Sequence, residues 1–395
     1  MPPIYLDNAS TAYPKAPPVA DAVRDYILNT GCNVGRGEYA QAYSAAEMVF
    51  ETRERLCDLF HFDSPKNVIF TMNITQSLNF LLKGLLHSGD HVLVSAMEHN
   101  AVMRPLTQLA DSGVSFTRMP CNRQGELLTG DLDSLVQPNT KAMVLLHASN
   151  VCGTLMPLEA VGAFCQKHRL LFLADAAQTA GVFPIDMKAL HLDALAFTGH
   201  KSLLGPQGVG GFVLTDALAR QVTPLISGGT GSISDQETVP AFLPDRFEPG
   251  TMNLPGIAGL HAALGYLKEI GIDAIRAHEQ SLSRLLQEGL TQLPGVRLLG
   301  VSDPFKRAPV VSVDFPGYDN AQIAYLLDSS FQVMTRCGLH CAPNAHKVLG
   351  TFPQGTVRFS VGFMNTQAQV LYAVDAVAKA LKMAQPLRLP VKKDL

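Results

Sequence analysis

A lysine that directly follows a predicted buried strand is the first residue with an evident chemical use. Residues 194–199, ALAFTG, can form a strand buried on both faces of a sheet, and His200 and Lys201 come next, at the start of a glycine-rich turn. A lone lysine is normally a solvated surface residue, but a partly desolvated one has a lowered pKa and can form an imine. Thr198 and His200 carry groups that can donate hydrogen bonds to a phosphate.

An acidic residue stands at the end of a second predicted buried strand. In LFLADAAQTAG, the strand expected over 170–176 leads to Asp175, and Gln178 follows three residues later. Ligands of parallel sheets bind at the carboxyl ends of the strands, so Asp175 is placed where a ligand would lie. Two interpretations stay open from the residues alone. Asp175 caps a helix, or its anion keeps a pyridine nitrogen protonated so that the ring accepts electrons.

Two further clusters also follow predicted strands. Ile74 and Thr75 begin a predicted helix after the strand at 68–70, where backbone N–H groups can bind an anion, although Thr75 would equally serve as an ordinary N-cap. His99 follows the strand expected at 91–96. It is either a loop residue with satisfied hydrogen bonds or a ring that stacks on an aromatic cofactor.

The elements that must position these residues alternate between strand and helix patterns. Such alternation predicts an α/β domain, with a mainly parallel sheet covered by helices on both faces, over residues 15–256. The expected strands are 68–70, 91–96, 142–147, 170–176 and 194–199, and the expected helices are 75–86, 100–112, 157–168 and one beginning near 178.

The remainder of the chain predicts a smaller α+β domain, formed by 257–395 together with 1–14. Before it, residues 227–256 are rich in Gly, Pro, Ser and Thr and predict a long loop, a kind of segment that is usually functional or mobile. The elements expected beyond the loop are a helical stretch over 257–293, strands at 309–315, 331–336 and 356–362, and helices at 319–329 and 366–383.

Taken together, the D-x-x-Q and G-H-K motifs and their neighbours resemble the class V aminotransferases, which are fold-type I enzymes dependent on pyridoxal 5′-phosphate (PLP). The resemblance spans nearly the whole chain and implies a mainly parallel, seven-stranded sheet. It implies that Lys201 carries PLP as a Schiff base, that Asp175 pairs with the pyridine nitrogen, that Gln178 bonds the ring hydroxyl and that His99 stacks on the ring. The implied phosphate ligands are Ile74, Thr75, Thr198 and His200, with Thr251 reaching the phosphate of a neighbouring subunit in a homodimer.

A stretch near the C-terminus, TRCGLHCAPNAHKVLGTFPQGTVRFS, narrows the resemblance. Its R-x-G-x-H-C-A pattern is similar to the active-site loop of group II cysteine desulfurases and selenocysteine lyases. The resemblance implies that Cys341 is the nucleophile, with Arg336 and His340 as cationic neighbours that favour its thiolate. It also implies that Arg358 binds the substrate carboxylate, with Asn150 and Arg36 close to the substrate.

The implied activity is a PLP-dependent cysteine desulfurase that converts L-cysteine to L-alanine and leaves a persulfide on Cys341. A selenocysteine lyase acting on L-selenocysteine, an aminotransferase or epimerase that does not use Cys341, and a catalytically inactive persulfide carrier remain alternatives. Cys341 could also be a buried structural cysteine or, with Cys337, His340 and His346, a metal ligand, although their spacing matches no standard zinc site. The short segment 343–355 after Cys341 implies limited reach, and hence a separate sulfur-acceptor protein.

Composition and the N-terminal sequence argue against several other classes of protein. The net charge of -3 and the scattered basic residues argue against nucleic-acid binding, and no apolar run reaches the length of a membrane helix. The N-terminus, MPPIYLDNAS, lacks the features of a signal peptide, so a cytoplasmic location is expected. An odd number of cysteines, seven, at irregular spacings predicts reduced thiols.

Overall fold

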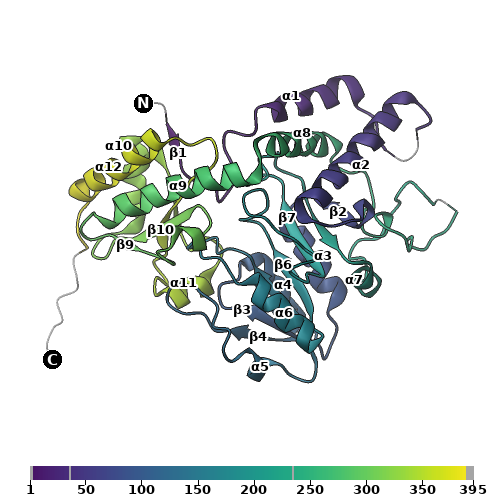
Figure 1. Ribbon diagram of the computed structural model, residues 1–395, viewed down its shortest axis with the longest axis horizontal. Helices are drawn as coiled ribbons and strands as arrows, with labels where there is room; N and C mark the ends of the chain where they lie inside the picture. The colour runs from purple at the N-terminus through teal and green to yellow at the C-terminus, as the bar shows by residue number, and fades with distance from the viewer. Residues whose placement is uncertain (1–2, 35–36, 234, 388–395) are drawn as a thin grey trace.

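The computed structural model describes residues 3–34, 37–233 and 235–387. These residues form three sheets, of which the largest has seven strands and lies at the centre of the larger part of the molecule (Figure 1). A four-stranded sheet and a two-stranded ribbon make up the smaller part. Over the described ranges, no helix combines the length and the apolar character needed to cross a membrane.

The central sheet has the strand order β2-β8-β7-β6-β5-β3-β4. All neighbouring pairs are parallel except those of β8, which runs antiparallel to both β2 and β7. Because β8 is antiparallel to both of its neighbours, β2 and β7 point the same way. The strands are β2 (Val68–Thr71), β3 (His91–Ser95), β4 (Ser115–Met119), β5 (Thr140–Leu146), β6 (Leu171–Asp175), β7 (Ala194–Thr198) and β8 (Gly210–Leu214).

The sheet confirms the predicted mainly parallel α/β architecture, and its five predicted strands are present. Strands β4 and β8 were not predicted. Strand β4 is partly exposed and polar, and β8 begins with two glycines, which disfavour strands in general. Glycine is needed at Gly211, because a Cβ there would lie 2.4 Å from the carbonyl oxygen of Ile69 on the neighbouring strand.

Helices cover both faces of the sheet, and alternating residues of each strand define the two cores. Val92 and Val94 pack with α3 (Ile74–Leu85), α4 (Asn100–Ala110) and α7 (Asp216–Gln221), whereas Leu93 lies in the opposite core. That opposite core contains side chains of α2 (Ala40–Phe60), α6 (Leu158–His168) and α8 (Leu254–Ile270). The short helices α1 (Pro18–Asp25) and α5 (Leu132–Leu135) complete this part.

One predicted helix is absent. Residues 177–182 form turns instead of the helix expected from about 178. Gly181 adopts φ 95°, which is incompatible with a helix, and a Cβ at this position would lie 2.5 Å from the carbonyl oxygen of Ser202. The local sequence pattern could not show this, because the close approach of Gly181 to Ser202 arises only from tertiary packing.

The smaller part combines the antiparallel sheet β12-β13-β10-β9 with a parallel ribbon of β1 and β11. Its predicted α+β character is present, but the strand expected over 331–336 is divided between two sheets. The strands are β1 (Ile4–Tyr5), β9 (Arg297–Leu298), β10 (Val310–Asp314), β11 (Val333–Met334), β12 (Arg336–Gly338) and β13 (Thr356–Ser360). Helices α10 (Asn320–Phe331) and α12 (Gln367–Met383) pack on it.

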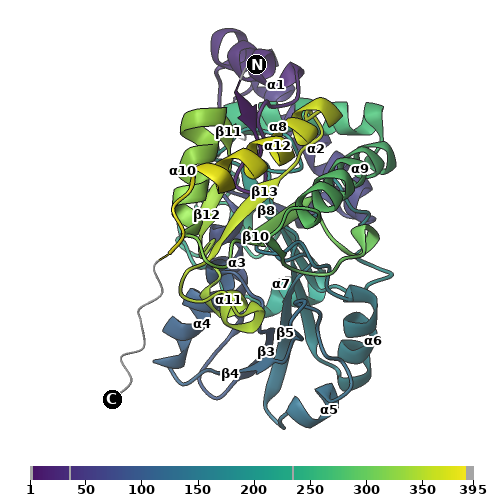
Figure 2. The same cartoon turned by 90° about the vertical axis from the view of Figure 1, so that its left-hand side faces the viewer.

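The helical stretch expected over 257–293 is broken at Gly271, which has φ 88°. Before the break, α8 packs in the core of the central sheet; after it, α9 (Ile272–Thr291) packs in the core of the smaller sheet. The domain boundary at 256/257 stays a prediction. Helix α11 (Pro343–Leu349), which was not predicted, lies where the two parts meet (Figure 2).

Candidate active site

The topology brings the predicted site residues to one edge of the central sheet. Strands β2, β3, β5, β6 and β7 all point the same way, so their carboxyl ends share this edge. Such an edge is where α/β sheets bind ligands. The residues that follow these strands are Ile74 and Thr75, His99, Asn150, Asp175 with Gln178, and Thr198 with His200 and Lys201.

Lys201 and Asp175 influence each other at this edge. Burial lowers the pKa of the Lys201 amine to about 8, and the nearby Asp175 carboxylate opposes that shift. Burial raises the pKa of Asp175, while a hydrogen bond from the Ala177 N–H (2.8 Å) and the charge of Lys201 oppose the rise. No helix follows Asp175 in this described segment, so the helix-cap interpretation is wrong. The lowered pKa favours the neutral amine, which is the form that attacks a carbonyl to make an imine.

Two groups next to Lys201 are buried without partners. The Thr198 hydroxyl and the His200 Nδ1 atom make no hydrogen bond with described residues, although Thr198 is only 2% exposed. Burial lowers the pKa of His200 to about 4, so its ring is neutral at physiological pH. Buried polar groups normally have partners, so the pair indicates a site for a bound polar group.

The N-terminus of α3 faces the same edge. Asn73, and not Thr75, is the N-cap, because its side chain accepts a hydrogen bond from the Gln76 N–H (3.0 Å). Ile74 and Thr75 occupy the first helical positions, whose N–H groups have no partner within a helix. Those N–H groups are available to an anion.

His99 caps α4 through its ring. Nδ1 accepts a hydrogen bond from the Ala101 N–H (3.0 Å), so the neutral ring carries its proton on Nε2. Burial, together with the nearby charges of Lys201 and Arg358, lowers the pKa of His99 to about 4. Gln178 is also buried, and its amide donates to the Ala9 carbonyl (3.1 Å).

Arg358 of β13 is brought to the edge from the smaller sheet. It is 3% exposed; Nη1 donates to the Asn150 carbonyl (3.1 Å) and Nη2 donates to Asp7 (2.8 Å) and to Ser10 (2.7 Å). Its Nε is buried and makes no hydrogen bond with described residues. Three of the five N–H donors therefore hold the guanidinium in place, and the Nε–H and the second N–H of Nη1 are left for a ligand. Arg336 pairs with Arg358 across the sheet, is exposed and donates to Ser10 (2.8 Å).

Cys341 is an exposed free thiol, so the interpretation as a buried structural cysteine is wrong. Its carbonyl accepts a hydrogen bond from the Asn100 N–H (2.8 Å), which holds the cysteine beside the start of α4 and next to His99. Burial lowers the pKa of the adjacent His340 to about 2, so this neutral ring supplies no charge to favour the thiolate. Among the described residues, no group of three or more His, Cys, Asp or Glu side chains is arranged to hold a metal ion.

A family model described as "Aminotransferase class-V" matches residues 4–372. The chain belongs to the class-V aminotransferase family. Its predicted family and fold-type I architecture are thereby confirmed.

Relatives of this class-V chain are named as cysteine desulfurases. A "Cysteine desulfurase" of Yersinia pseudotuberculosis is 33% identical over 87% of this chain and 85% of the relative. "Cysteine desulfurase CsdA" of Escherichia coli is 30% identical over 96% of this chain and 94% of the relative. The solved apo structure of a cysteine desulfurase from Thermococcus onnurineus has a TM-score of 0.90 at 30% identity, covering 96% of this chain and 95% of that one. These relatives support an enzymatic role in the desulfurase branch.

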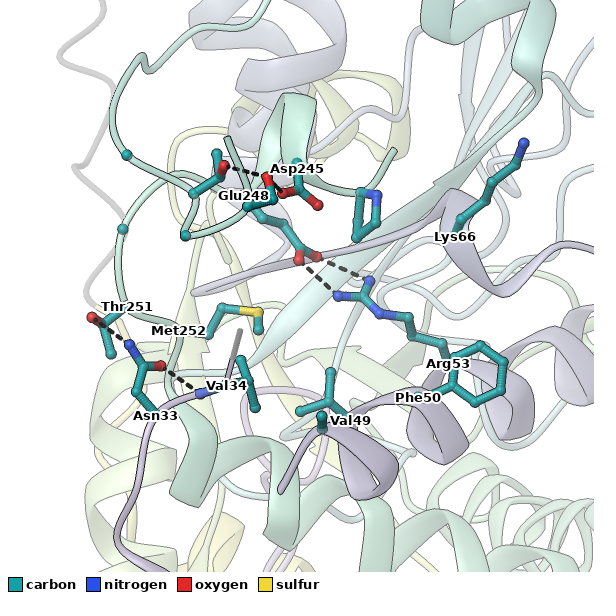
Figure 3. Close-up of a pocket in the computed structure, with 17 residues that line it drawn as sticks. Asn33, Val34, Val49, Phe50, Arg53, Lys66, Asp245, Glu248, Thr251 and Met252 are labelled. Atoms are coloured by element: carbon teal, nitrogen blue, oxygen red, sulfur yellow. Dashed lines mark hydrogen bonds and ion pairs between the residues drawn. The ribbon is translucent and has the colours of Figure 1, made fainter. Parts of the chain in front are cut away.

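Among the described residues, Thr251 makes no hydrogen bond to any other predicted residue of this class-V site. Thr251 is exposed on the rim of a separate cavity of about 660 Å³, where its hydroxyl lies 3.5 Å from the Asn33 amide (Figure 3). A buried ion pair between Arg53 and Glu248 (2.7 Å) lines the same cavity. Arg36 lies outside the described residues.

Two residues of the class-V site were missed by sequence reasoning. Asp7 and Ser10, in LDNAS directly after β1, both bond Arg358, and Ser10 also donates to Asp7 (2.8 Å). The available signal was a polar cluster directly after a short apolar run, IYL. Burial raises the pKa of the Cys337 thiol to about 11, which disfavours the thiolate that a nucleophile needs.

Proposed function

We propose that the protein is a PLP-dependent cysteine desulfurase that converts L-cysteine to L-alanine and retains the sulfur as a persulfide on Cys341. The observation that carries the proposal is the exposed Cys341 thiol, anchored through its carbonyl to Asn100 at the edge where Lys201 and Arg358 also lie. The similarity to cysteine desulfurases over nearly the whole chain supports the same activity.

The side chains at the edge fit the cofactor. The unpartnered Thr198 hydroxyl, the unpartnered His200 nitrogen and the first N–H groups of α3 match the needs of a phosphate. Asp175 is a buried carboxyl of the kind that would pair with a pyridine nitrogen, and His99 offers a neutral ring. PLP bound to Lys201 would supply an electron sink for the bonds at the substrate Cα.

The chain's own residues then have distinct roles. Arg358 holds the substrate carboxylate with its spare donors, since charge-assisted hydrogen bonds from a fixed guanidinium are both strong and directional. Lys201 moves the proton at the substrate Cα. The Cys341 thiolate forms an S–S bond with the substrate sulfur as the C–S bond breaks. The bonding electrons stay with the substrate carbon, which is protonated to yield alanine.

The decisive experiment compares Cys341→Ser with Cys337→Ser in purified, PLP-loaded protein supplied with L-cysteine and a reductant. Alanine formation is expected to fall by roughly a hundredfold or more in Cys341→Ser, because the acceptor of the sulfur is lost. Cys337→Ser is the matched control and is expected to retain activity. Undiminished alanine and sulfide production by Cys341→Ser would show that this thiol is not the sulfur acceptor, whereas mercaptopyruvate or D-cysteine in place of alanine would indicate the aminotransferase or the epimerase.

The cofactor claim has its own readout. The PLP-loaded protein is expected to absorb in the visible region, and Lys201→Ala is expected to lose that band. A protein that stays colourless with added PLP would overturn the claim. A coloured protein that forms a Cys341 persulfide from a donor, yet makes no alanine from L-cysteine, would indicate the inactive carrier.

The preference for sulfur or selenium is tested in the same assay. L-selenocysteine turnover that survives in Cys341→Ser, beside negligible L-cysteine turnover in the parent, would indicate a selenocysteine lyase.

We further propose a homodimer in which Thr251 reaches the neighbouring site, and a separate protein that accepts the sulfur. Light scattering gives the mass of the particle, and Thr251→Ala is expected to weaken PLP retention only if the dimer forms.

A further inference from the structure

The backbone at the nucleophile has an unusual conformation. His340 and Cys341 are consecutive non-glycine residues with φ 47° and φ 57°, both in the left-handed region. A Cβ makes this region unfavourable, and a succession of two such residues persists only where the surroundings hold it. The conformation of the Cys341 loop is therefore imposed by contacts outside the loop.

Two hydrogen bonds hold the carbonyl groups of the left-handed pair His340–Cys341, which we call the kink. The Asn150 side chain donates to the His340 carbonyl (2.7 Å), and the Asn100 N–H donates to the Cys341 carbonyl (2.8 Å). The buried His340 ring lies 3.2 Å from the Thr356 hydroxyl. The kink is thus tied to the connections after β5 and β3, which also carry the substrate and cofactor residues.

A further contact holds the far side of the loop. Asn344, in the first turn of α11, donates through its amide to the Ala96 carbonyl (2.7 Å). Ala96 belongs to the tight connection between β3 and His99, and this connection is rigid. The buried Glu98 carboxyl accepts from the Ser95 hydroxyl (2.6 Å) and from the Leu146 N–H of β5 (3.0 Å).

We propose that Asn344 is a positioning residue for sulfur transfer: it holds the left-handed His340–Cys341 kink against the connection that carries His99, and so keeps the thiol aimed at the substrate sulfur. Asn150 has the same task through the His340 carbonyl. Neither side chain needs to touch the reacting atoms. The inference rests on the proposed desulfurase function and names what orients its nucleophile.

The expected consequence is a defect confined to the step in which Cys341 acts. Asn344→Asp keeps the shape of the side chain but removes the N–H donor, and Asn344→Ala removes both. In each variant kcat for alanine formation is expected to fall roughly tenfold or more, because a small misplacement of a reacting group costs about this much or more. KM for L-cysteine and the visible band of the cofactor are expected to stay close to those of the parent, because Lys201 and Arg358 are undisturbed.

Asn139→Ala is the matched control. Asn139 also donates its amide to a backbone carbonyl, that of Gly89 (2.7 Å), but it precedes β5 at the opposite end of the strand. This variant is expected to retain kcat. A merely structural role for Asn344 would instead lower thermal stability and cofactor content together with kcat, and that pattern would overturn the proposal.

The rate at which iodoacetamide alkylates Cys341, followed by mass spectrometry, tests without turnover whether Asn344 holds the thiol in place. The Asn344 variants are expected to change this rate at least about fivefold relative to the parent and to Asn139→Ala, since the thiol leaves its fixed position. If the parent makes no alanine, the proposed function fails, but this measurement still shows whether Asn344 positions Cys341. If the parent is active but both Asn344 variants match it in kcat and in alkylation, the positioning role is wrong.

Discussion

The Asp7 carboxylate lies 2.8 Å from Nη2 of Arg358, and the two residues form an ion pair that is 19% and 3% exposed. A residue near the N-terminus thus sets the orientation of the guanidinium proposed to bind the substrate carboxylate. The same carboxylate offsets the cost of burying the Arg358 charge, since burial lowers the pKa of Arg358 and Asp7 opposes that shift.

Asp7→Asn is expected to destabilise the ligand-free protein and to strengthen the binding of carboxylate ligands. The free energy of unfolding, measured with urea, is expected to fall by about 2 kcal/mol, because the buried guanidinium loses its countercharge. L-Alanine is expected to raise the melting temperature of this variant by more than it raises that of the parent, because its carboxylate restores the lost charge. Asp111→Asn, at an exposed position, is the control; equal ligand-induced shifts in all three proteins would contradict the argument.

Arg358→Lys is expected to weaken substrate binding more than Arg336→Lys does. A lysine keeps the charge but loses the planar fork that Asp7, Ser10 and Asn150 hold in place, so KM for L-cysteine is expected to rise by roughly tenfold or more. Arg336 is exposed and its side chain bonds only Ser10 among the described residues, so its variant is expected to change KM much less. Steady-state kinetics on the two variants decide the point, and the reverse order would exclude Arg358 as the carboxylate ligand.

The sequence was sufficient to predict the sheet edge because buried strands carry a strong local signal. Lys201, Asp175 and His99 each follow an apolar run, and a parallel sheet necessarily brings such positions together. Asp7 and Ser10 could not be predicted in this way, because they reach Arg358 across 351 and 348 positions of chain. The left-handed conformation of His340 and Cys341 was equally unpredictable, since neither residue is a glycine and the contacts that hold them come from distant parts of the chain.

Arg307 provides a further example of a residue that only the tertiary structure explains. It is 1% exposed, and it donates to the Gln287 side chain (2.9 Å) and to the carbonyls of Cys152 (2.8 Å), Val301 (2.8 Å) and Val310 (2.7 Å). These contacts join α9 and β10 to the connection after Asn150. Arg307→Met is expected to lower the free energy of unfolding by about 3 kcal/mol, because several buried acceptors lose their donor. Lys306→Met, at the exposed neighbouring position, is the control for urea denaturation and is expected to change little.

The lowered pKa of Lys201 predicts how PLP loading depends on pH. Only the neutral amine attacks the aldehyde of PLP, and with a pKa of about 8 its fraction rises through pH 8, whereas an unperturbed lysine would titrate near pH 10.4. The rate at which the visible band appears in apo-protein is therefore expected to rise with pH and to level off above roughly pH 9. Because the charge of Asp175 raises the pKa of Lys201, Asp175→Asn is expected to move the midpoint to lower pH. A midpoint near that of free lysine would show that Lys201 is not desolvated, and a midpoint unmoved by Asp175→Asn would show that the two side chains are not coupled.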